Sequence, residues 1–237
     1  MSANYQNFGH YITEGWSNEP KEIFKFLEHY LSQEKRNKHT SLLDVGCATG
    51  ELIHFLSRHH PEFQFTGVDI FDDLIHQCQE LQPEKKFLKA SILELPASLE
   101  QQFDVITVVG VLTIFDEEEL PLFFNNLFRA CRSNASIYIL SPFNEYGVDC
   151  EIKHRKRQQG KRGNWEKGWN IFSKETIIEH IENHAQSWSF HPFKLPFNLS
   201  QKEDPIRTWT IETESNKRQL TNGLKLLVDH YLLKISV

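Results

Sequence analysis

The sequence has no long hydrophobic run and no signal peptide. No apolar stretch approaches the roughly 20 residues that a membrane helix needs. The first residues, MSANYQNFGHYITEGW, contain neither the basic region nor the apolar region of a secretion signal. Both absences predict a cytoplasmic protein that has no membrane partner.

Cysteine is scarce and widely spaced. The four cysteines, Cys47, Cys78, Cys131 and Cys150, form no CxxC pair, which excludes a zinc or disulfide framework readable from sequence. No group of His, Cys and Asp has the spacing of metal ligands either. We therefore expect reduced, mostly structural thiols and no bound metal.

Positive charge is in deficit. The chain has 26 Lys and Arg against 32 Asp and Glu, a formal net charge of −6. This balance argues against a protein that holds nucleic acid through overall basicity, although a local basic patch stays compatible with it. With 237 residues, 39% of them apolar, the chain is long enough to bury a full core, and we expect one domain over residues 1–237.

Predicted strands and helices alternate along the first part of the chain, and no internal repeat is present. This order is typical of an α/β fold with a doubly wound, mostly parallel sheet covered on both faces. Ligands bind such sheets at the carboxyl ends of the strands. The predicted strands are 41–45, 63–68, 86–89, 103–109 and 136–140, and the predicted helices are 20–31, 52–60, 74–81 and 117–131. Ser17 or Asn18 is available as the N-cap of the first of these helices.

The C-terminal part has a different pattern. A helix over 174–183 is followed by a strand at 188–191, a hairpin of 207–214 and 218–221, and a closing strand at 231–237. These segments predict antiparallel strands at the C-terminal edge of the sheet. The chain then divides into an N-terminal segment and helix (1–33), a central core (41–141), a long basic insertion (142–172) and a C-terminal part (173–237).

Small residues recur in the turn after the first strand, at Gly46, Ala48 and Gly50. A backbone without large side chains can approach a ligand closely at such a turn. The next strand ends at Asp69, 19 residues beyond Gly50, about where a carboxylate that binds a ribose belongs. These features predict a nucleoside cofactor.

Two acidic residues indicate which cofactor this is. Glu51 stands where a dinucleotide-binding loop needs a small residue, and its charge opposes a pyrophosphate at the start of the helix. Asp44 precedes the glycines and suits a ligand that presents an ammonium group. S-adenosylmethionine has an ammonium group and a ribose but no phosphate, so we expect it as the cofactor.

Four segments in order, LLDVGCATG, FTGVDI, FLKASILELP and FDVITVVGVLTIF, span residues 41–115. Together they closely resemble the class I S-adenosylmethionine-dependent methyltransferases, which have a Rossmann-like fold. The resemblance implies that the glycine loop lies along the cofactor, with Asp44 near its amino acid end, Asp69 on the ribose hydroxyls and Ile70 against the adenine. The cofactor-binding residues it implies are Asp44, Gly46, Cys47, Ala48, Gly50, Asp69, Ile70, Ser91, Ile92 and Val109.

The sequence departs from the family pattern at two of these positions. Ala48 replaces the middle glycine, and Ser91 stands where an aspartate often contacts the adenine amino group. Simpler interpretations also stay open: Asp44 as a cap of the following turn, and Asp69 as a residue that ends a strand.

The residues after the fourth strand, Val109 to Thr113, bear on the methyl acceptor. Relatives that methylate nucleic acid bases carry an Asn/Asp-Pro-Pro-aromatic or a Pro-Cys signature here, and this chain carries neither. By elimination we expect methyl transfer to O, N or C of a small molecule. A hydroxyl acceptor needs a general base, for which His10, Tyr11 and His154 are the catalytic candidates. The aromatic residues of the N-terminal segment, Tyr5, Phe8 and Trp16 among them, form either a lid over the cofactor or simple packing.

The insertion has an unusual charge. Residues 151–167 contain seven Lys and Arg against the two acids Glu151 and Glu166, a local net charge of +5 that leaves −11 on the rest of the chain. This contrast favours an anionic acceptor, such as a phosphorylated, nucleotide-linked or carboxylated metabolite, while a solvated surface loop explains it as well. Trp165, Trp169 and Asn170 are available beside it as a stacking wall.

Three alternatives remain at this point. An RNA or protein methyltransferase would use the basic patch 153–167 as its footprint. A non-catalytic module would bind S-adenosylmethionine without transferring a methyl group. An NAD-dependent oxidoreductase would use the same glycine loop for a different cofactor. We expect a monomer or a homodimer and regard nucleic acid as a disfavoured partner.

Overall fold

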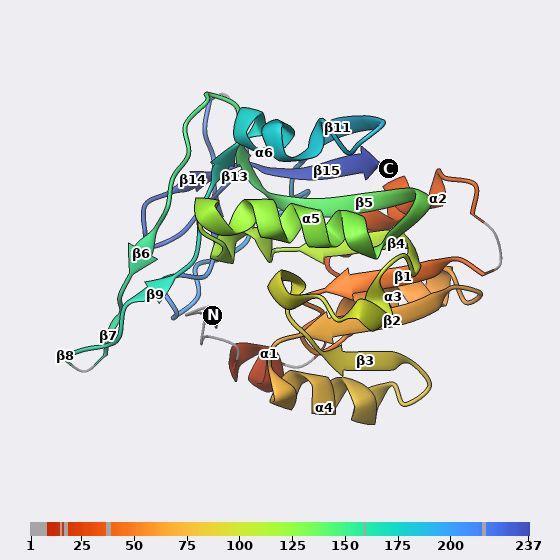
Figure 1. Cartoon of the computed structure of the whole chain (residues 1–237). Helices are drawn as coiled ribbons and strands as arrows, with labels where there is room; N and C mark the ends of the chain where they lie inside the picture. The colour runs from red at the N-terminus through yellow and green to blue at the C-terminus, as the bar shows by residue number, and fades with distance from the viewer. Residues whose placement is uncertain (1–8, 15, 17–18, 37–38, 159, 215–216) are drawn as a thin grey trace.

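The computed structural model describes residues 9–14, 16, 19–36, 39–158, 160–214 and 217–237. Five neighbouring strands of its main sheet are parallel: β1 (Ser41–Val45), β2 (Gln64–Asp69), β3 (Lys86–Lys89), β4 (Phe103–Val109) and β5 (Cys131–Asn144). The strand order is β11-β15-β5-β4-β1-β2-β3 (Figure 1). Strand order reverses at β1, which has β2 on one side and β4 on the other, so a ligand crevice is expected at its carboxyl end.

The C-terminal edge of the main sheet is antiparallel, as predicted. Strand β15 (His230–Ser236) lies between β5 and β11 (Ser187–Phe193) and is antiparallel to both. The predicted hairpin also forms, because β12 (Trp209–Ile211) pairs antiparallel with β13 (Gln219–Thr221). It belongs, however, to a separate three-stranded sheet with β14 (Leu227–Val228) and not to the edge of the main sheet.

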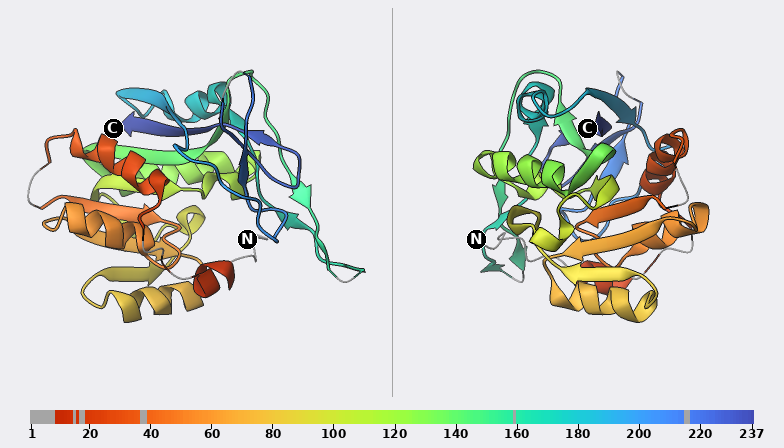
Figure 2. Two further views of the ribbon diagram at one scale, coloured as in Figure 1. Left: turned by 180° about the vertical axis from the view of Figure 1, so that it is seen from behind. Right: turned by 45° about the vertical axis from the view of Figure 1, so that its right-hand side comes forward.

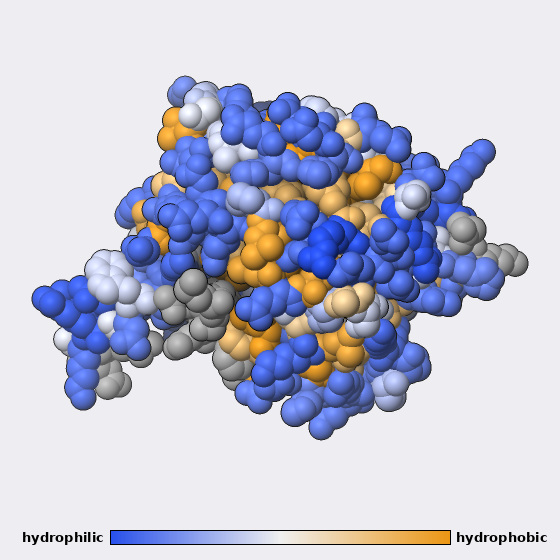
Figure 3. Space-filling model, viewed as in Figure 1, coloured by the Kyte–Doolittle hydropathy of each residue, from blue (hydrophilic) through white to orange (hydrophobic). Residues whose placement is uncertain are grey.

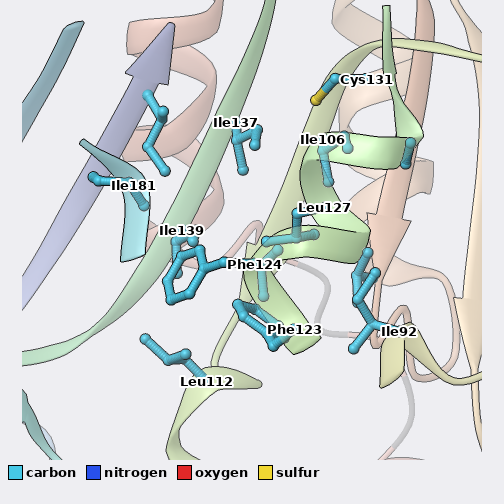
Figure 4. Packing of buried hydrophobic residues seen from close by; sticks show 14 of the residues in the cluster. Ile92, Ile106, Leu112, Phe123, Phe124, Leu127, Cys131, Ile137, Ile139 and Ile181 are labelled. Atoms are coloured by element: carbon cyan, nitrogen blue, oxygen red, sulfur yellow. The ribbon is translucent and has the colours of Figure 1, made fainter. Parts of the chain in front are cut away.

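Helices cover both faces of the sheet (Figure 2). Helices α2 (Glu22–Ser32), α3 (Glu51–His59) and α4 (Asp72–Leu81) pack on one face, and α5 (Leu120–Ala130) and α6 (Lys174–Ile181) on the other. Alternate residues of the strands divide between the two cores: Leu42 and Val105 face the first group of helices, and Leu43 and Ile106 face the second. Figure 4 shows Ile106, Ile137 and Ile139 packed against Phe123, Phe124 and Leu127 of α5.

Several predicted helix ends differ from the structure. The helix expected over 117–131 begins as a 3-10 turn, η4 (Glu117–Glu119), and Cys131 already belongs to β5. The first long helix has Lys21 at its N-cap, and the expected caps, Ser17 and Asn18, lie outside the described residues. A short helix, α1 (Gly9–Glu14), precedes it. The remaining 3-10 turns are η1 (Ile92–Glu94), η2 (Ala97–Leu99) and η3 (Leu112–Ile114).

The basic insertion contains strands that the sequence does not predict. Strand β6 (Lys153–His154) pairs with β9 (Glu166–Lys167), and β7 (Arg157–Gln158) pairs with β8 (Lys161–Arg162). Strand β10 (Phe172–Ser173) then returns to pair with the end of β5. The β6–β9 and β7–β8 ladders have two residue pairs each, too few to produce a period-2 hydrophobic pattern. We call residues 153–167 the arm.

Among the described residues, no helix combines the length and the apolar character that crossing a bilayer requires. The same part of the chain contains no cluster of three or more His, Cys, Asp or Glu side chains arranged to hold a metal ion.

Candidate functional site

The loop between β1 and α3 turns sharply because three of its residues adopt left-handed backbone conformations. Gly46, Ala48 and Gly50 have φ angles of 71°, 46° and 78°. The N–H groups of Gly46 and Cys47 both donate to the carbonyl of Val68, at 2.8 and 3.0 Å. The loop is therefore held against the end of β2, next to the point where strand order reverses.

Glycine at position 46 is required by a neighbouring loop. A Cβ atom on Gly46 would lie 2.3 Å from Cγ2 of Val111, which follows β4. From the sequence, the glycine at position 46 is attributed to a ligand that approaches the backbone. In the structure, the side chain of Val111 approaches the backbone of Gly46 this closely. The loops after β1 and β4 are thus packed together.

Asp69, at the end of β2, fixes the shape of the loop. Its Oδ2 atom accepts a hydrogen bond from the N–H of Ala48 at 3.0 Å, and its Oδ1 atom accepts one from the N–H of Phe71 at 3.1 Å. The side chain is 8% exposed, and burial raises the pKa of the carboxyl group above its usual range. Asp69 therefore holds the left-handed residue Ala48 in place, and its remaining lone pairs are available to a ligand.

Asp44 is a nearly fully buried carboxylate in β1. It is 3% exposed, and the hydroxyl of Thr107 donates to its Oδ1 atom at 2.8 Å. Burial, together with the charge of Asp69, raises the pKa of Asp44 from 3.8 to about 7. The side chain bonds to Thr107 on β4 and not to the turn that follows, so a capping role is not what the geometry shows.

Asp44 and Asp69 are alike in having no partner of opposite charge within the described part of the chain. Among the described residues, no Lys, Arg or His forms an ion pair with Asp44 or Asp69. Buried charges in proteins are normally paired, and an unpaired one favours a cationic ligand or takes up a proton. The ligand crevice expected at the carboxyl ends of β1 and β2 would therefore suit a cation.

The other expected cofactor-binding residues also lie at or after the carboxyl ends of the strands. Ile70 follows β2, Val109 ends β4, and Ser91 and Ile92 follow β3. The Ser91 hydroxyl accepts a hydrogen bond from the N–H of Leu93 at 3.1 Å, which caps η1. The resemblance assigns Ser91 to the adenine and does not predict this capping role. Because the hydroxyl oxygen accepts the hydrogen bond from Leu93, the O–H of Ser91 is still free to donate one.

Cys47 is a buried thiol inside the loop. A hydrogen bond with Cys78 and burial raise its pKa well above the usual range, so it stays protonated and unreactive. The thiol of Cys78 donates to the carbonyl of Ala48 at 3.1 Å. Cys78 therefore supports the loop from the side of α4.

Trp16 connects the N-terminal segment to the loop, a contact that no local sequence pattern could reveal. Its indole Nε1–H donates to the carbonyl and to the hydroxyl of Thr49, at 3.2 and 3.1 Å, and its ring lies 4.6 Å from that of His54. Lys21 forms an ion pair with Glu51 close by. The N-terminal segment thus contacts the loop, which both a lid and simple packing would do, while Tyr5 and Phe8 lie outside the described residues.

The three catalytic candidates lie in two places. Tyr11 is 36% exposed on α1, and His10 lies on the same helix with its side chain outside the described residues. His154 lies in β6 and is 8% exposed; neither ring nitrogen has a hydrogen-bond partner among the described residues. Burial lowers the pKa of His154, and Glu166 partly opposes this effect. No hydrogen bond joins His154 to the described residues of the loop after β1.

A separate polar depression lies at the opposite edge of the sheet. Glu34, Arg36, Ser136 and Ser236 contribute to its lining, at the amino end of β5. Glu34 accepts a hydrogen bond from Ser136 and forms ion pairs with Arg36 and Lys234. These groups satisfy one another, so this depression has no evident role in the chemistry of the crevice.

Comparison with known proteins finds similarity to methyltransferases. A family model described as a methyltransferase domain matches residues 42–134. The malonyl-[acyl-carrier protein] O-methyltransferase of Priestia megaterium is 26% identical over 188 residues, which cover 77% of this chain and 66% of that protein. The chain therefore spans about two thirds of the length of this relative.

Solved structures share the fold. The YcgJ protein of Bacillus subtilis superimposes with a TM-score of 0.62 at 10% identity, covering 91% of this chain and 98% of that one. The 1,6-didemethyltoxoflavin-N1-methyltransferase of Burkholderia thailandensis, solved with 1,6-didemethyltoxoflavin and S-adenosylhomocysteine, gives 0.53 at 11% identity, covering 91% and 76%. At these identities the likeness concerns the architecture, and it confirms the expected mostly parallel, Rossmann-like sheet.

Proposed function

Because this chain belongs to the class I S-adenosylmethionine-dependent methyltransferases, we propose that it transfers a methyl group from S-adenosylmethionine to a small, anionic metabolite. The observation that carries the cofactor assignment is the pair of buried carboxylates, Asp44 and Asp69, which have no cationic partner among the described residues. A cofactor with an ammonium group and a ribose, and without phosphate, matches these two groups.

The residues at the crevice have defined roles in this proposal. Asp44 accepts hydrogen bonds from the amino group of the cofactor, Asp69 binds the ribose hydroxyls, and Ile70 packs on the adenine. When bound, the cofactor supplies an electrophilic methyl group on a sulfonium. The task of the protein is then to align the acceptor with that methyl group, an effect worth up to about 7–11 kcal/mol. An anionic acceptor is already a nucleophile, whereas a hydroxyl acceptor requires a base.

Among the base candidates, His10 and Tyr11 are better placed than His154. Both lie on α1, a few residues before Trp16, which contacts the loop after β1. His154 lies in the arm and has no hydrogen bond to the described residues of that loop. We therefore assign proton removal from a hydroxyl acceptor to α1.

The structure weakens the argument from Glu51 against a dinucleotide cofactor. The sequence predicts that Glu51 repels a pyrophosphate, but Lys21 forms an ion pair with this carboxylate and offsets its charge. The choice between S-adenosylmethionine and a dinucleotide therefore depends on the two buried carboxylates, and it requires a direct comparison of ligands.

The insertion and one relative support the proposal of an anionic acceptor. Two of its seven cations, Lys156 and Lys167, form ion pairs with Asp204 and Asp116, and the other five form none with described residues. One relative is named for O-methyl transfer to malonyl-[acyl-carrier protein], and a structural neighbour for N1-methyl transfer to 1,6-didemethyltoxoflavin. Neither name favours the RNA methyltransferase interpretation.

We expect S-adenosylhomocysteine to raise the melting temperature of the protein and NAD to leave it unchanged. A ligand at 100 times its Kd stabilises the folded state by about 2.7 kcal/mol, which is roughly 5–10 °C for a chain of this size. The measurement is thermal denaturation with each ligand, followed by transfer of a tritiated methyl group to panels of anionic and neutral metabolites. Stabilisation by NAD alone would identify an oxidoreductase, and binding without transfer to any acceptor would identify a non-catalytic module.

Replacing Asp69 by Ala should weaken the binding of S-adenosylhomocysteine by about 1.5–3 kcal/mol, because charge-assisted hydrogen bonds are lost. The variant should also be less stable, since the N–H groups of Ala48 and Phe71 lose their acceptor. Calorimetric titration of the folded variant measures the first effect and denaturant unfolding the second. Asp73→Ala, which removes an exposed carboxylate from α4, is the matched control. An unchanged affinity in folded Asp69→Ala would refute the ribose assignment.

A further inference from the structure

The arm projects from the carboxyl edge of the sheet, the same edge as the candidate site (Figures 1 and 2). Its base is fixed to the loop after β4. The side-chain Nδ2 of Asn170 donates to the carbonyl of Phe115 at 2.7 Å, and its backbone N–H donates to the carbonyl of Thr113 at 2.9 Å. The same loop contains Val111, which packs against Gly46. The arm is therefore anchored beside the crevice, although its far end extends away from the body.

The arm has two different faces. His154 is buried and Lys156 forms an ion pair with Asp204 at 3.1 Å, so these residues define the face that packs on the body. Side chains alternate along a strand, and directly opposite residues point to the same side. The outer face is the exposed side that carries Arg157, Arg162 and Trp165, with the Arg155 guanidinium over the Trp165 ring. Lys153 does not belong to this set, because it lies opposite Lys167, which forms an ion pair with Asp116 of the body.

Two arginines face each other on the outer face without a counter-ion. Arg157 pairs with Arg162 in the β7–β8 ladder, both side chains are exposed, and neither forms an ion pair with a described residue. Like charges directly opposite each other destabilise a strand pair. The comparable repulsion between Lys153 and Lys167 is relieved, because Lys167 forms an ion pair with Asp116. The arginine pair is thus left with two guanidinium groups that a phosphate could bridge.

Trp165 adds a second type of contact. It is 60% exposed, and the guanidinium of Arg155 lies 4.6 Å from the centre of its ring. Hydrophilic side chains dominate the arm, which is the projection at the left of Figure 3. A large exposed aromatic ring among cations can stack on a base while the cations bind its phosphates.

We propose that the outer face of the arm binds the nucleotide part of a nucleotide-linked acceptor, with the phosphates on Arg157 and Arg162 and the base on Trp165. This inference rests on the proposed function and narrows its acceptor class. A single nucleotide fits better than an RNA strand, because Trp165 is the only Phe, Tyr or Trp in residues 153–167 and the chain outside residues 151–167 has a net charge of −11. A strand of RNA would require a longer basic track.

The test uses protein saturated with S-adenosylhomocysteine, so that nucleotides cannot enter the cofactor crevice. ADP and UDP are titrated calorimetrically, with inorganic pyrophosphate and a 12-residue oligouridylate as further probes. We expect both nucleotides to bind more tightly than pyrophosphate. The double variant Arg157→Gln/Arg162→Gln should weaken their binding at least about tenfold. Trp165→Leu should reduce it to the level of pyrophosphate.

The controls separate the arm from the rest of the surface. Lys194→Gln/Lys225→Gln removes two exposed cations elsewhere and should leave nucleotide binding unchanged. Binding of S-adenosylhomocysteine itself should be the same in all variants, so a failure of the cofactor assignment is recognised independently. The inference is overturned if nucleotides do not bind, if they bind wild type and the arginine variant equally, or if pyrophosphate binds as tightly as ADP. Tighter, strongly salt-dependent binding of the oligouridylate would overturn it in favour of RNA.

Discussion

Replacing Asp44 by Asn should make the unliganded protein more stable at pH 8 and should weaken its binding of S-adenosylhomocysteine roughly 10–150-fold. The folded-state pKa of Asp44 is about 7, against 3.8 for a free carboxyl group. Between these values the folded state binds more protons than the unfolded state, so this group lowers stability as the pH rises through that window. Above about pH 7 the full penalty is present, which at 1.36 kcal/mol per pKa unit is about 4 kcal/mol. The buried N–H groups of the Asn amide offset part of this gain, so the variant should recover roughly 1–3 kcal/mol.

The effect on binding has the opposite sign. An ionised Asp44 pairs with the amino group of the ligand, so the affinity of the wild-type protein should increase as the pH rises from about 5 to about 7. The amide of the Asp44→Asn variant keeps an oxygen for the Thr107 hydroxyl but has no charge, and the loss of about 1.5–3 kcal/mol corresponds to roughly 10–150-fold weaker binding.

Denaturant unfolding at pH 4 and pH 8 measures the stability effect of Asp44→Asn, and calorimetry at several pH values measures the binding effect. Asp73→Asn, at an exposed position in the first turn of α4, is the control; it should leave binding unchanged and lower stability by at most about 0.3–1 kcal/mol. A variant that is less stable than wild type at pH 8, or one that binds S-adenosylhomocysteine normally, would contradict the assignment of Asp44 as the residue that binds the amino group.

Replacing Gly46 by Val should cause the largest loss of stability of the changes considered. Gly46 has a φ angle of 71°, which β-branched residues strongly disfavour, and a Cβ atom there would lie 2.3 Å from Cγ2 of Val111. Backbone strain and overpacking each contribute about 1–3 kcal/mol, so we expect a loss of roughly 3 kcal/mol or more and no detectable cofactor binding.

Two further variants separate strain from the clash at Gly46. Gly147→Ala introduces a Cβ atom at a φ angle of 65° with no atom within 4 Å, so its loss of stability measures the cost of backbone strain without a clash. Gly46→Ala should be more destabilising than Gly147→Ala, and the additional substitution Val111→Ala should recover part of the difference. If Gly46→Ala and Gly147→Ala are equally stable, the close packing of the two loops is not the reason for glycine at position 46.

The parallel sheet was predictable because its strands are buried on both faces and therefore appear as short apolar runs. β1 and β4, for example, are apolar runs that end at small residues, Gly46 and Gly110. The strands of the arm were not predicted, because their ladders of two residue pairs are too short for alternation or length to distinguish them from loops. The hairpin of β12 and β13 was predicted, but periodicity could not show that it joins β14 in a separate sheet.

The candidate site was predictable where spacing along the chain reflects position at strand ends. Asp44, Asp69 and the loop from Gly46 to Gly50 come together as expected. Contacts between distant segments could not be anticipated, such as Trp16 with Thr49 or Val111 with Gly46. The sequence overestimates the charge of the insertion for the same reason, since the acids that neutralise Lys156 and Lys167 are distant along the chain.

A crystal structure of the protein with S-adenosylhomocysteine tests the central assignment most directly. We expect the amino group of the ligand within hydrogen-bonding distance of Asp44, the ribose hydroxyls on Asp69 and the adenine against Ile70. The same structure would show whether the sulfur faces the loop after β4, beside the base of the arm. A ligand bound elsewhere, or no ligand at saturating concentration, would contradict the account.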